Sequence, residues 1–340
     1  MSPDIRLLVG GKRNVRIMRP LATVLLAVTA LSLASCNKSS SNPIPPAPSA
    51  PVAQVSPTPA LFTRGEAEAL LEQRLSSICE RAQGVVAVAV IHVEKSRIAS
   101  INGKAPLPLY SVFKLPLAIT VLKQVEANRL KADRLVHITP DELVPGTPEN
   151  SALYRNPVDF TISQLIEFSI SRSDNTSTDK LLQLIGGPAR VSEQMRAFGL
   201  NTLDIHSTVS DYVKNPKLVN TGSAEDIATL LTQLQQGKSL QPAQSELLIK
   251  YMRGATTGLK RLRAHLPAGT MVADKTGSGE RDAQTNAPKA TNDVGLITLP
   301  NAKGTLAVAV LVTGSKLVAA EQEKLIAELA RAAYDEYAND

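Results

Sequence analysis

The sequence predicts an α/β (α+β) fold, with an antiparallel five-stranded sheet flanked by the N- and C-terminal helices, plus an all-α lobe. Strand-like segments lie towards both ends of the folded region, within 85–101 and 271–313, and the long region between them is mostly helical. A sheet built from such distant segments leaves the central helices to form a separate lobe. We expect a cleft where this lobe meets the sheet.

The folded region is predicted to begin with a helix that covers one face of the sheet. Thr63-x-x-Glu66 has the spacing of a capping box. The apolar residues after it recur on one helical face: Ala67, Leu70, Leu71, Leu75 and Ile78. Strands are predicted at 85–93 and 97–101, with a short turn between them.

The central region reads as helices that are interrupted by prolines, at Pro106, Pro116, Pro140, Pro145 and Pro148. Thr161-x-x-Gln164 predicts the start of a helix that runs towards Ile170. A further helix is predicted from Thr178 to Ile185.

The C-terminal third returns to strands, predicted at 271–275, 294–299 and 305–313. The last two are joined across a turn at 300–304. A final helix, about 319–337, carries one apolar face formed by Leu325, Ile326, Leu329 and Ala333. We expect it to share the sheet face that the first helix covers.

Residues 1–35 are predicted to be a lipoprotein signal peptide. They hold five basic residues and one acidic residue, and their apolar run at 21–33 is too short to span a bilayer. The run ends in Leu-Ala-Ser-Cys at 33–36, which resembles a bacterial lipobox, so Cys36 is the predicted lipidation site. The alternative is a plain anchor helix or an uncleaved signal.

Residues 36–60 are rich in Pro and Ser, cannot bury a core, and are predicted to form a semi-extended tether. The folded domain is predicted to span 61–340. We therefore expect an exported, periplasmic or cell-envelope lipoprotein anchored to a bacterial membrane. With Cys36 lipidated, Cys79 has no disulfide partner and is interpreted as a small core residue.

The net charge of +6 does not indicate binding to nucleic acid. Most of this charge lies in residues 1–35, and the remainder of the chain is nearly balanced, with few aromatic residues and no Trp. Proteins that bind nucleic acids combine a basic surface with aromatic side chains on which bases stack. No nucleic-acid partner is expected.

The first motif that carries chemistry is Ser111-x-x-Lys114. The residues after Lys114 are apolar nearly all round, which predicts a buried helix. Ser111 would lie in its first turn, near free N–H groups, with Lys114 on the same face. Burial disfavours the ammonium form, so Lys114 could accept the serine proton. Ser-x-x-Lys alone is common on surfaces. Burying a lysine on an apolar helix, however, costs folding free energy, which favours a functional role for Lys114.

Two further motifs follow. Ser-Asp-Asn at 173–175 lies between two predicted helices, where the same residues are also common as caps and turns. Lys-Thr-Gly-Ser at 275–278 ends a predicted strand. A cation followed by hydroxyls and a glycine suits an edge that receives a carboxylate-bearing acyl group. In isolation it could be any strand-to-turn transition.

Together and in this order, the three motifs form the signature of class A β-lactamases and penicillin-binding proteins. The chain resembles this family from about Thr63 to Tyr337. Family-like stretches outside the motifs lie at 141–145, 185–188, 256–258, 266–269 and 292–297. The resemblance implies a β-lactamase/transpeptidase-like fold and a serine hydrolase.

The resemblance also implies a role for each matching residue. Ser111 would be acylated by the β-lactam carbonyl, with Lys114 as proton acceptor, and Ser173 would relay a proton to the leaving nitrogen. Substrate binding would involve Asn175, Lys275, Thr276, Gly277 and Ser278. The backbone N–H groups of Ser111 and Ser278 would form the oxyanion hole.

No cofactor and no metal is implied. The four histidines show no metal-ligand spacing and belong to none of the motifs: His92, His137, His206 and His265. The expected partners are a β-lactam or cell-wall peptide as substrate and, through the lipid anchor, a membrane. The protein is expected to be a monomer.

One family feature is missing. Class A β-lactamases clear the acyl-enzyme with a loop glutamate that activates water, and this chain has no glutamate from Gln194 to Ala224. Val209 aligns with the glutamate position and cannot act as a base. Asp211 is the nearest carboxylate and a candidate deacylation base, although it equally fits a solvated loop acid.

This gap leaves three hypotheses. The favoured one is a serine β-lactamase that hydrolyses the β-lactam amide through a Ser111 acyl-enzyme. The second is a penicillin-binding, deacylation-poor serine hydrolase or DD-peptidase-like enzyme that acts on cell-wall peptide. The third is a non-enzymatic binding module, and the retained serines and lysines of the motifs argue against it. Sustained turnover of a β-lactam would distinguish the first from the second.

Overall fold

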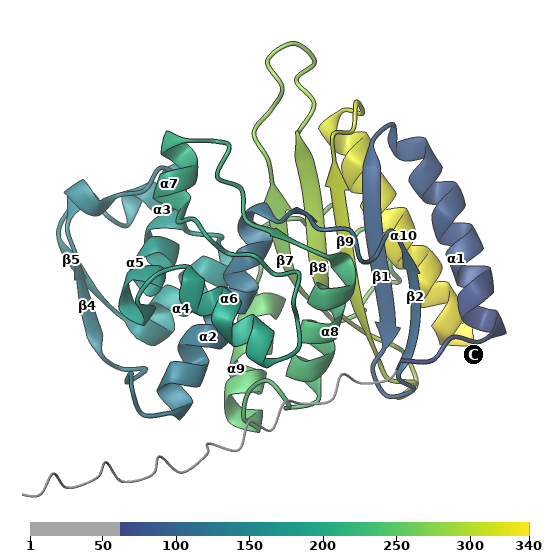
Figure 1. Ribbon diagram of the computed structural model, residues 1–340, viewed down its shortest axis with the longest axis horizontal. Helices are drawn as coiled ribbons and strands as arrows, with labels where there is room; N and C mark the ends of the chain where they lie inside the picture. The colour runs from purple at the N-terminus through teal and green to yellow at the C-terminus, as the bar shows by residue number, and fades with distance from the viewer. Residues whose placement is uncertain (1–61, 340) are drawn as a thin grey trace, which may run out of the picture. The chain divides into compact units, whose positions relative to one another are not determined.

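The computed structural model describes residues 62–339, so the predictions for the signal peptide, Cys36 and the tether lie outside the described residues. The main sheet has five strands in the order β2-β1-β9-β8-β7, and every neighbouring pair is antiparallel (Figure 1). These strands are β1 (Val85–His92), β2 (Arg97–Ile101), β7 (Val272–Ser278), β8 (Ala290–Thr298) and β9 (Thr305–Thr313). The predicted fold class is confirmed.

The central strands β1 and β9 are buried on both faces of the sheet. Successive side chains of a strand point to opposite faces. In β1, Val86, Val88 and Val90 belong to one core, whereas Ala87 and Ala89 belong to the other. The small alanines allow the helices on their side to pack close to the sheet.

The helices from the two ends of the described chain lie side by side on the valine face (Figure 1). They are α1 (Glu66–Cys79) and α10 (Ala319–Asn339). With the sheet they enclose one core, to which they contribute Leu71, Leu75, Ile326 and Leu329. The prediction that the first and last helices cover the same face is confirmed.

The predicted capping box at Thr63 is wrong. The N-cap of α1 is Gly65, whose backbone N–H donates to the carboxylate of Glu68 at 2.8 Å. Thr63 instead forms a β-bridge with Arg97, and its N–H donates to the carbonyl of Ser96. Pairing with the sheet edge holds Thr63 in extended backbone, so the helix starts later than the motif suggests.

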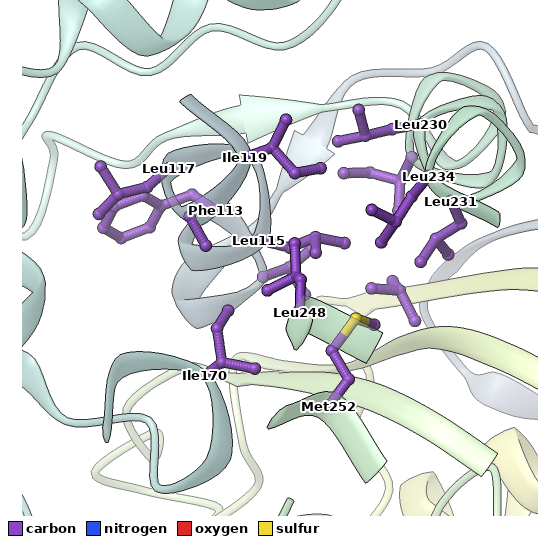
Figure 2. Packing of buried hydrophobic residues seen from close by; sticks show 14 of the residues in the cluster. Phe113, Leu115, Leu117, Ile119, Ile170, Leu230, Leu231, Leu234, Leu248 and Met252 are labelled. Atoms are coloured by element: carbon purple, nitrogen blue, oxygen red, sulfur yellow. The ribbon is translucent and has the colours of Figure 1, made fainter. Parts of the chain in front are cut away.

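The other face of the sheet is covered by helices that belong to the second core. Helix α2 (Lys114–Glu126) runs through its middle, and every residue from 114 to 122 is buried, as its apolar sequence predicts. Figure 2 shows side chains converging there from α2, α4 (Ile162–Ser171), α8 (Ala224–Gln235) and α9 (Pro242–Arg253). They include Leu115, Ile119, Ile170, Leu230, Leu234, Leu248 and Met252. This packing fixes the position of α2, and with it the start of that helix.

Shorter elements complete the described chain. They are η1 (Glu80–Ala82), β3 (Leu107–Pro108), η2 (Tyr110–Phe113), β4 (Leu135–Ile138), η3 (Pro140–Glu142), α3 (Pro148–Ala152), β5 (Val158–Thr161), α5 (Asn175–Ile185), α6 (Ala189–Ala197), α7 (Val209–Lys214) and β6 (Thr221–Gly222). Among residues 62–339, no helix combines the length and the apolar character needed to cross a membrane.

Two helix starts bear on the site. The predicted cap at Thr161 is confirmed, because its hydroxyl accepts from the N–H of Gln164 at 3.1 Å. Helix α5 begins at Asn175 rather than at the predicted Thr178, with Asp174 as its N-cap. The Ser-Asp-Asn motif therefore forms a helix start and not a free turn.

Candidate active site

Ser111 lies in η2, a short 3₁₀ helix that leads directly into α2. It was expected in the first turn of the α-helix itself, but that helix begins only at Lys114. Tyr110, just before the serine, has a φ of +47°, a left-handed conformation that is unfavourable for a bulky side chain. The surrounding contacts must hold this turn in place, because such strain persists only when the structure over-determines it.

Strand β7 packs directly against the turn at Gly277. A Cβ on Gly277 would run into the carbonyl oxygen of Leu109 and press closely on the backbone nitrogen of Val112. From the neighbouring strand, the amide of Asn292 donates to the carbonyl oxygens of Pro108 at 2.8 Å and Leu109 at 3.2 Å. The absence of a side chain at Gly277 therefore brings the strand edge beside Ser111.

The register of the sheet directs the backbone N–H of Ser278 away from β8. Gly279 and Ala290 form a hydrogen-bonded pair, with an N···O distance of 2.9 Å. Such pairs alternate along an antiparallel ladder, so Ser278 and its partner Thr291 form a non-hydrogen-bonded pair. Because β7 is an edge strand that contacts η2, the Ser278 N–H faces the side where Ser111 lies.

Lys114 is fully buried at the start of α2. Its Nζ donates to the carbonyl of Ser173 at 2.7 Å and to Oδ1 of Asn175 at 2.8 Å. Burial lowers the pKa of Lys114 to about 7, against the opposing effect of the nearby Asp174 and Asp179 carboxylates. A lysine with this pKa is partly neutral at neutral pH and can accept a proton.

Ser173 joins the first and third motifs. Its hydroxyl lies 3.4 Å from the Nζ of Lys114 and 3.1 Å from the Nζ of Lys275. Like Tyr110, Ser173 has a left-handed backbone, with a φ of +54°. The α5 N-cap follows at once: the carboxylate of Asp174 accepts from the N–H of Ser177 at 2.6 Å. The helix start thus holds Ser173 between the two lysines.

Asn175 and Lys275 complete the cluster. Asn175 accepts from Lys114 through Oδ1 and donates through its amide to the carbonyl of Pro145 at 2.5 Å. Lys275 is fully buried and also donates to the carbonyl of Thr276 at 2.8 Å. Burial, and then the charge of Lys114, lower the pKa of Lys275 well below its usual range. The three chain segments that carry the motifs thus meet in one hydrogen-bonded cluster.

Thr276 contacts a residue of the family-like stretch 256–258, whereas Ser278 contacts an arginine that the sequence did not single out. The hydroxyl of Thr276 lies 2.7 Å from that of Thr257. The guanidinium of Arg261 donates to the Ser278 hydroxyl at 2.8 Å and to the Gly277 carbonyl at 3.2 Å. Arg261 is 8% exposed, and no sequence pattern distinguishes it from other arginines of the chain.

A cavity of about 160 Å³ opens at Ser111. Its wall includes η2, Asn175, Ser278 and the segment 207–220. Val209 lines it, at the position where the resemblance calls for a glutamate. None of the lining residues is Asp, Glu or His.

Asp211 does not line this cavity. Its carboxylate accepts from the N–H of Thr208 at 3.1 Å and closes the capping box of α7. These hydrogen bonds lower the pKa of Asp211, and the residue is not among those that line the cavity. The geometry does not favour Asp211 as the deacylation base.

Asp179 binds the start of α7, a role that the sequence motifs did not indicate. It lies one helical turn after Asn175, and its carboxylate accepts from the backbone N–H groups of Val209 at 2.8 Å and Ser210 at 2.9 Å. The hydroxyl of Ser210 donates to it as well, at 2.7 Å. The only sequence signal was the spacing of four residues from the Ser-Asp-Asn motif.

Comparison with known proteins agrees with this arrangement. Residues 70–337 match the model of the beta-lactamase enzyme family. The extended-spectrum beta-lactamase PER-1 of Pseudomonas aeruginosa is 33% identical over 78% of this chain and 86% of its own length. A crystal structure of a beta-lactamase from Chitinophaga pinensis, 34% identical, covers 78% of this chain and 98% of its own, with a TM-score of 0.75. The TLA-1 extended-spectrum beta-lactamase, 30% identical, covers 80% and 100% with a TM-score of 0.76.

The fold and the site therefore define a serine hydrolase of the β-lactamase type. The chain belongs to the beta-lactamase enzyme family, and its relatives place it with the class A enzymes.

Proposed function

We propose that this protein is a serine β-lactamase that opens the β-lactam amide through an acyl-enzyme on Ser111. The observation that carries the proposal is the meeting of Lys114, Ser173 and Lys275 in one hydrogen-bonded cluster next to Ser111. Membership of the family supports the same reaction. The alternative of a deacylation-poor penicillin-binding enzyme is not favoured, because the relatives are β-lactamases.

In the acylation step, the neutral amine of Lys114 accepts the proton of the Ser111 hydroxyl while Oγ attacks the lactam carbonyl. Negative charge develops on the carbonyl oxygen, where the N–H groups of Ser111 and Ser278 would stabilise it. As the C–N bond breaks, Ser173 protonates the leaving nitrogen and is reprotonated by Lys114. The product is an ester of Ser111, with the ring nitrogen now a free amine.

The substrate carboxylate would be bound at the strand edge. Lys275 and Thr276 are the residues that the resemblance assigns to this task, and Arg261 adds a third polar group through its contacts with Ser278 and Gly277. Opposite charge attracts the substrate, and a planar guanidinium suits a carboxylate. Asn175 would position the amide of the substrate side chain.

Deacylation requires a base for water, and the expected glutamate is absent. Val209 cannot supply one, and the carboxylate of Asp211 is committed to its helix cap. Lys114, three residues after Ser111, has a pKa of about 7. We propose that Lys114 takes the proton of the attacking water as well, so that one base serves both half-reactions and deacylation is the slower of the two.

A fluorescent penicillin and a chromogenic cephalosporin together test this function. The penicillin should label the protein covalently, and Ser111→Ala should abolish labelling. The cephalosporin should give a burst followed by sustained turnover. Equal labelling of wild type and Ser111→Ala would exclude Ser111 as the nucleophile. A burst without turnover would return the function to the penicillin-binding alternative.

Anchoring to the cell envelope through Cys36 remains part of the proposal. The lipobox-like sequence at 33–36 and the Pro/Ser-rich segment after it support export and lipidation. We also propose that the protein acts as a monomer, since all the side chains of the cluster come from one chain. Size-exclusion chromatography with light scattering tests the oligomeric state.

A further inference from the structure

Two buried side chains hold the residues on either side of Ser173. Asn150, in α3, donates from its side-chain amide to the carbonyl of Arg172 at 3.1 Å. Tyr154, which follows α3, donates from its hydroxyl to the carboxylate of Asp174 at 2.6 Å. Because Arg172 and Asp174 flank Ser173, one short segment, 150–154, binds the chain on both sides of this serine. We call this segment the brace.

The hydrogen bonds of the brace are made where water does not replace them. Tyr154 is 1% exposed and Asn150 is 4% exposed. The hydroxyl of Tyr154 also lies 2.8 Å from that of Ser177, and because it donates to Asp174 it accepts from Ser177. Burial, and then the charge of Asp174, raise the pKa of Tyr154, so its phenol remains a donor. Loss of either hydrogen bond would leave a buried polar group without this partner.

The brace supports a backbone conformation that needs support. Ser173 has a φ of +54°, in the left-handed region. A residue other than glycine keeps such a conformation only where the surrounding contacts over-determine it. Helix α5 fixes one side through the cap of Asp174 on the N–H of Ser177. The brace adds contacts from a different element of the chain, before and after the strained residue.

The backbone of Ser173 also sets the position of its hydroxyl. The Ser173 carbonyl accepts from the Nζ of Lys114 at 2.7 Å, and the hydroxyl lies 3.4 Å from that nitrogen and 3.1 Å from the Nζ of Lys275. Proton transfer requires heavy atoms at roughly 2.6–3.2 Å. A change in the backbone at Ser173 would therefore move the hydroxyl out of reach of the groups with which it exchanges protons.

We propose that Asn150 and Tyr154 are positioning residues for the step that breaks the lactam C–N bond. They hold the residues on both sides of Ser173, so that its hydroxyl stays within reach of Lys114 and of the leaving nitrogen. This inference rests on the proposed β-lactamase function, in which Ser173 protonates that nitrogen and is reprotonated by Lys114. Neither Asn150 nor Tyr154 lines the Ser111 cavity, so neither is assigned a contact with the substrate.

The chemistry of the leaving group separates this role from a purely structural one. A lactam nitrogen leaves as an amine and takes a proton from Ser173 as the C–N bond breaks. A nitrophenyl ester instead loses a nitrophenolate, which keeps the electron pair of the broken C–O bond and needs no proton. In both reactions Lys114 takes the proton of Ser111, whose Oγ becomes acylated. A misplaced Ser173 should therefore slow acylation by the lactam more than acylation by the ester.

The test measures the rate constant for acylation of Ser111 by a penicillin and by the nitrophenyl ester of the same acyl side chain. Tyr154→Phe keeps the ring that packs on Phe160 and should raise the ratio of ester to penicillin rates about 10-fold, as expected for one lost charge-assisted hydrogen bond. Asn150→Ala loses a neutral hydrogen bond and should raise the ratio about 3-fold. Ser173→Ala removes the relay itself and should raise the ratio most.

Tyr251→Phe is the matched control. Its hydroxyl pairs with that of Ser163 at 2.8 Å, a contact between α9 and α4 that does not involve the brace. This variant should keep the wild-type ratio, and thermal unfolding shows which variants are folded. A wild-type ratio in folded Tyr154→Phe and Asn150→Ala would overturn the proposal. Failure of both to fold would also overturn it, because the brace would then serve stability alone.

Failure of the proposed function gives a different result. If wild type forms no Ser111 adduct with the penicillin, the β-lactamase function fails and the brace inference fails with it. If adducts form but Ser173→Ala keeps the wild-type ratio, Ser173 is not the proton donor and the brace has no relay to position. If Ser173→Ala raises the ratio and neither brace variant does, only the brace inference is wrong.

Discussion

Lys114 donates a 2.8 Å hydrogen bond to the side-chain oxygen of Asn175, so the buried cation of the core helix is tied to the start of α5. The bond favours the charged lysine, as do the nearby Asp174 and Asp179. Burial is the larger effect and lowers the pKa of Lys114 to about 7. Because burial outweighs these favourable interactions, Lys114 can act as a base near neutral pH.

The first prediction concerns pH. Below its pKa, Lys114 is protonated and cannot accept the serine proton. The rate constant for acylation of Ser111 should therefore fall about tenfold per unit as the pH drops below about 7, and level off above it. Stopped-flow acylation across the pH range measures this profile. Lys114→Ala should slow acylation by roughly 10²–10⁴-fold and remove the inflection. An inflection that survives in Lys114→Ala belongs to another group.

The second prediction concerns Val209. Because it lines the cavity where a glutamate is expected, Val209→Glu should place a carboxylate near the acyl carbonyl and speed deacylation. A well-placed general base supplies roughly 10²–10⁴-fold. The lifetime of the acyl-enzyme by intact mass is the readout. Lys214→Glu, on the same helix but outside the cavity lining, is the control and should not shorten that lifetime.

The third prediction separates Lys114 from Asp211. Asp211→Asn removes the charge but keeps an oxygen that can accept from the N–H of Thr208. Turnover of penicillins should therefore remain at the wild-type level. An acyl-enzyme trapped in Asp211→Asn, but cleared by wild type, would identify Asp211 as the deacylation base and refute the two-step role of Lys114.

The fourth prediction concerns anchoring. Mass spectrometry of the mature protein should find a diacylglycerol on Cys36 at the N-terminus. The protein should partition into detergent, because the acyl chains transfer many methylenes into lipid. Cys36→Ser should release soluble protein or leave the precursor uncleaved. A mature N-terminus at another residue, without lipid, would contradict the lipoprotein assignment.

Local sequence patterns were sufficient to predict several helices of this protein. The apolar run after Lys114 predicted a helix buried on all sides, and the spacing of Thr161 and Gln164 predicted a helix start. Both depend on periodicity and capping within a few residues, which a sequence displays directly. The pattern at Thr63 failed because pairing with Arg97 on the sheet edge outweighed the local motif.

The long-range contacts that build the site could not be predicted from such local patterns. Lys114, Ser173 and Lys275 belong to recognisable motifs. They meet, however, only because strands from distant parts of the chain assemble into one sheet. Arg261 belongs to none of the three motifs, and neither do Tyr212 and Glu280, whose side chains share a hydrogen bond. Each of these contacts joins segments that are far apart in the chain. Residue type and spacing encode the local chemistry, whereas long-range packing sets which side chains face Ser111 and how large the cavity is.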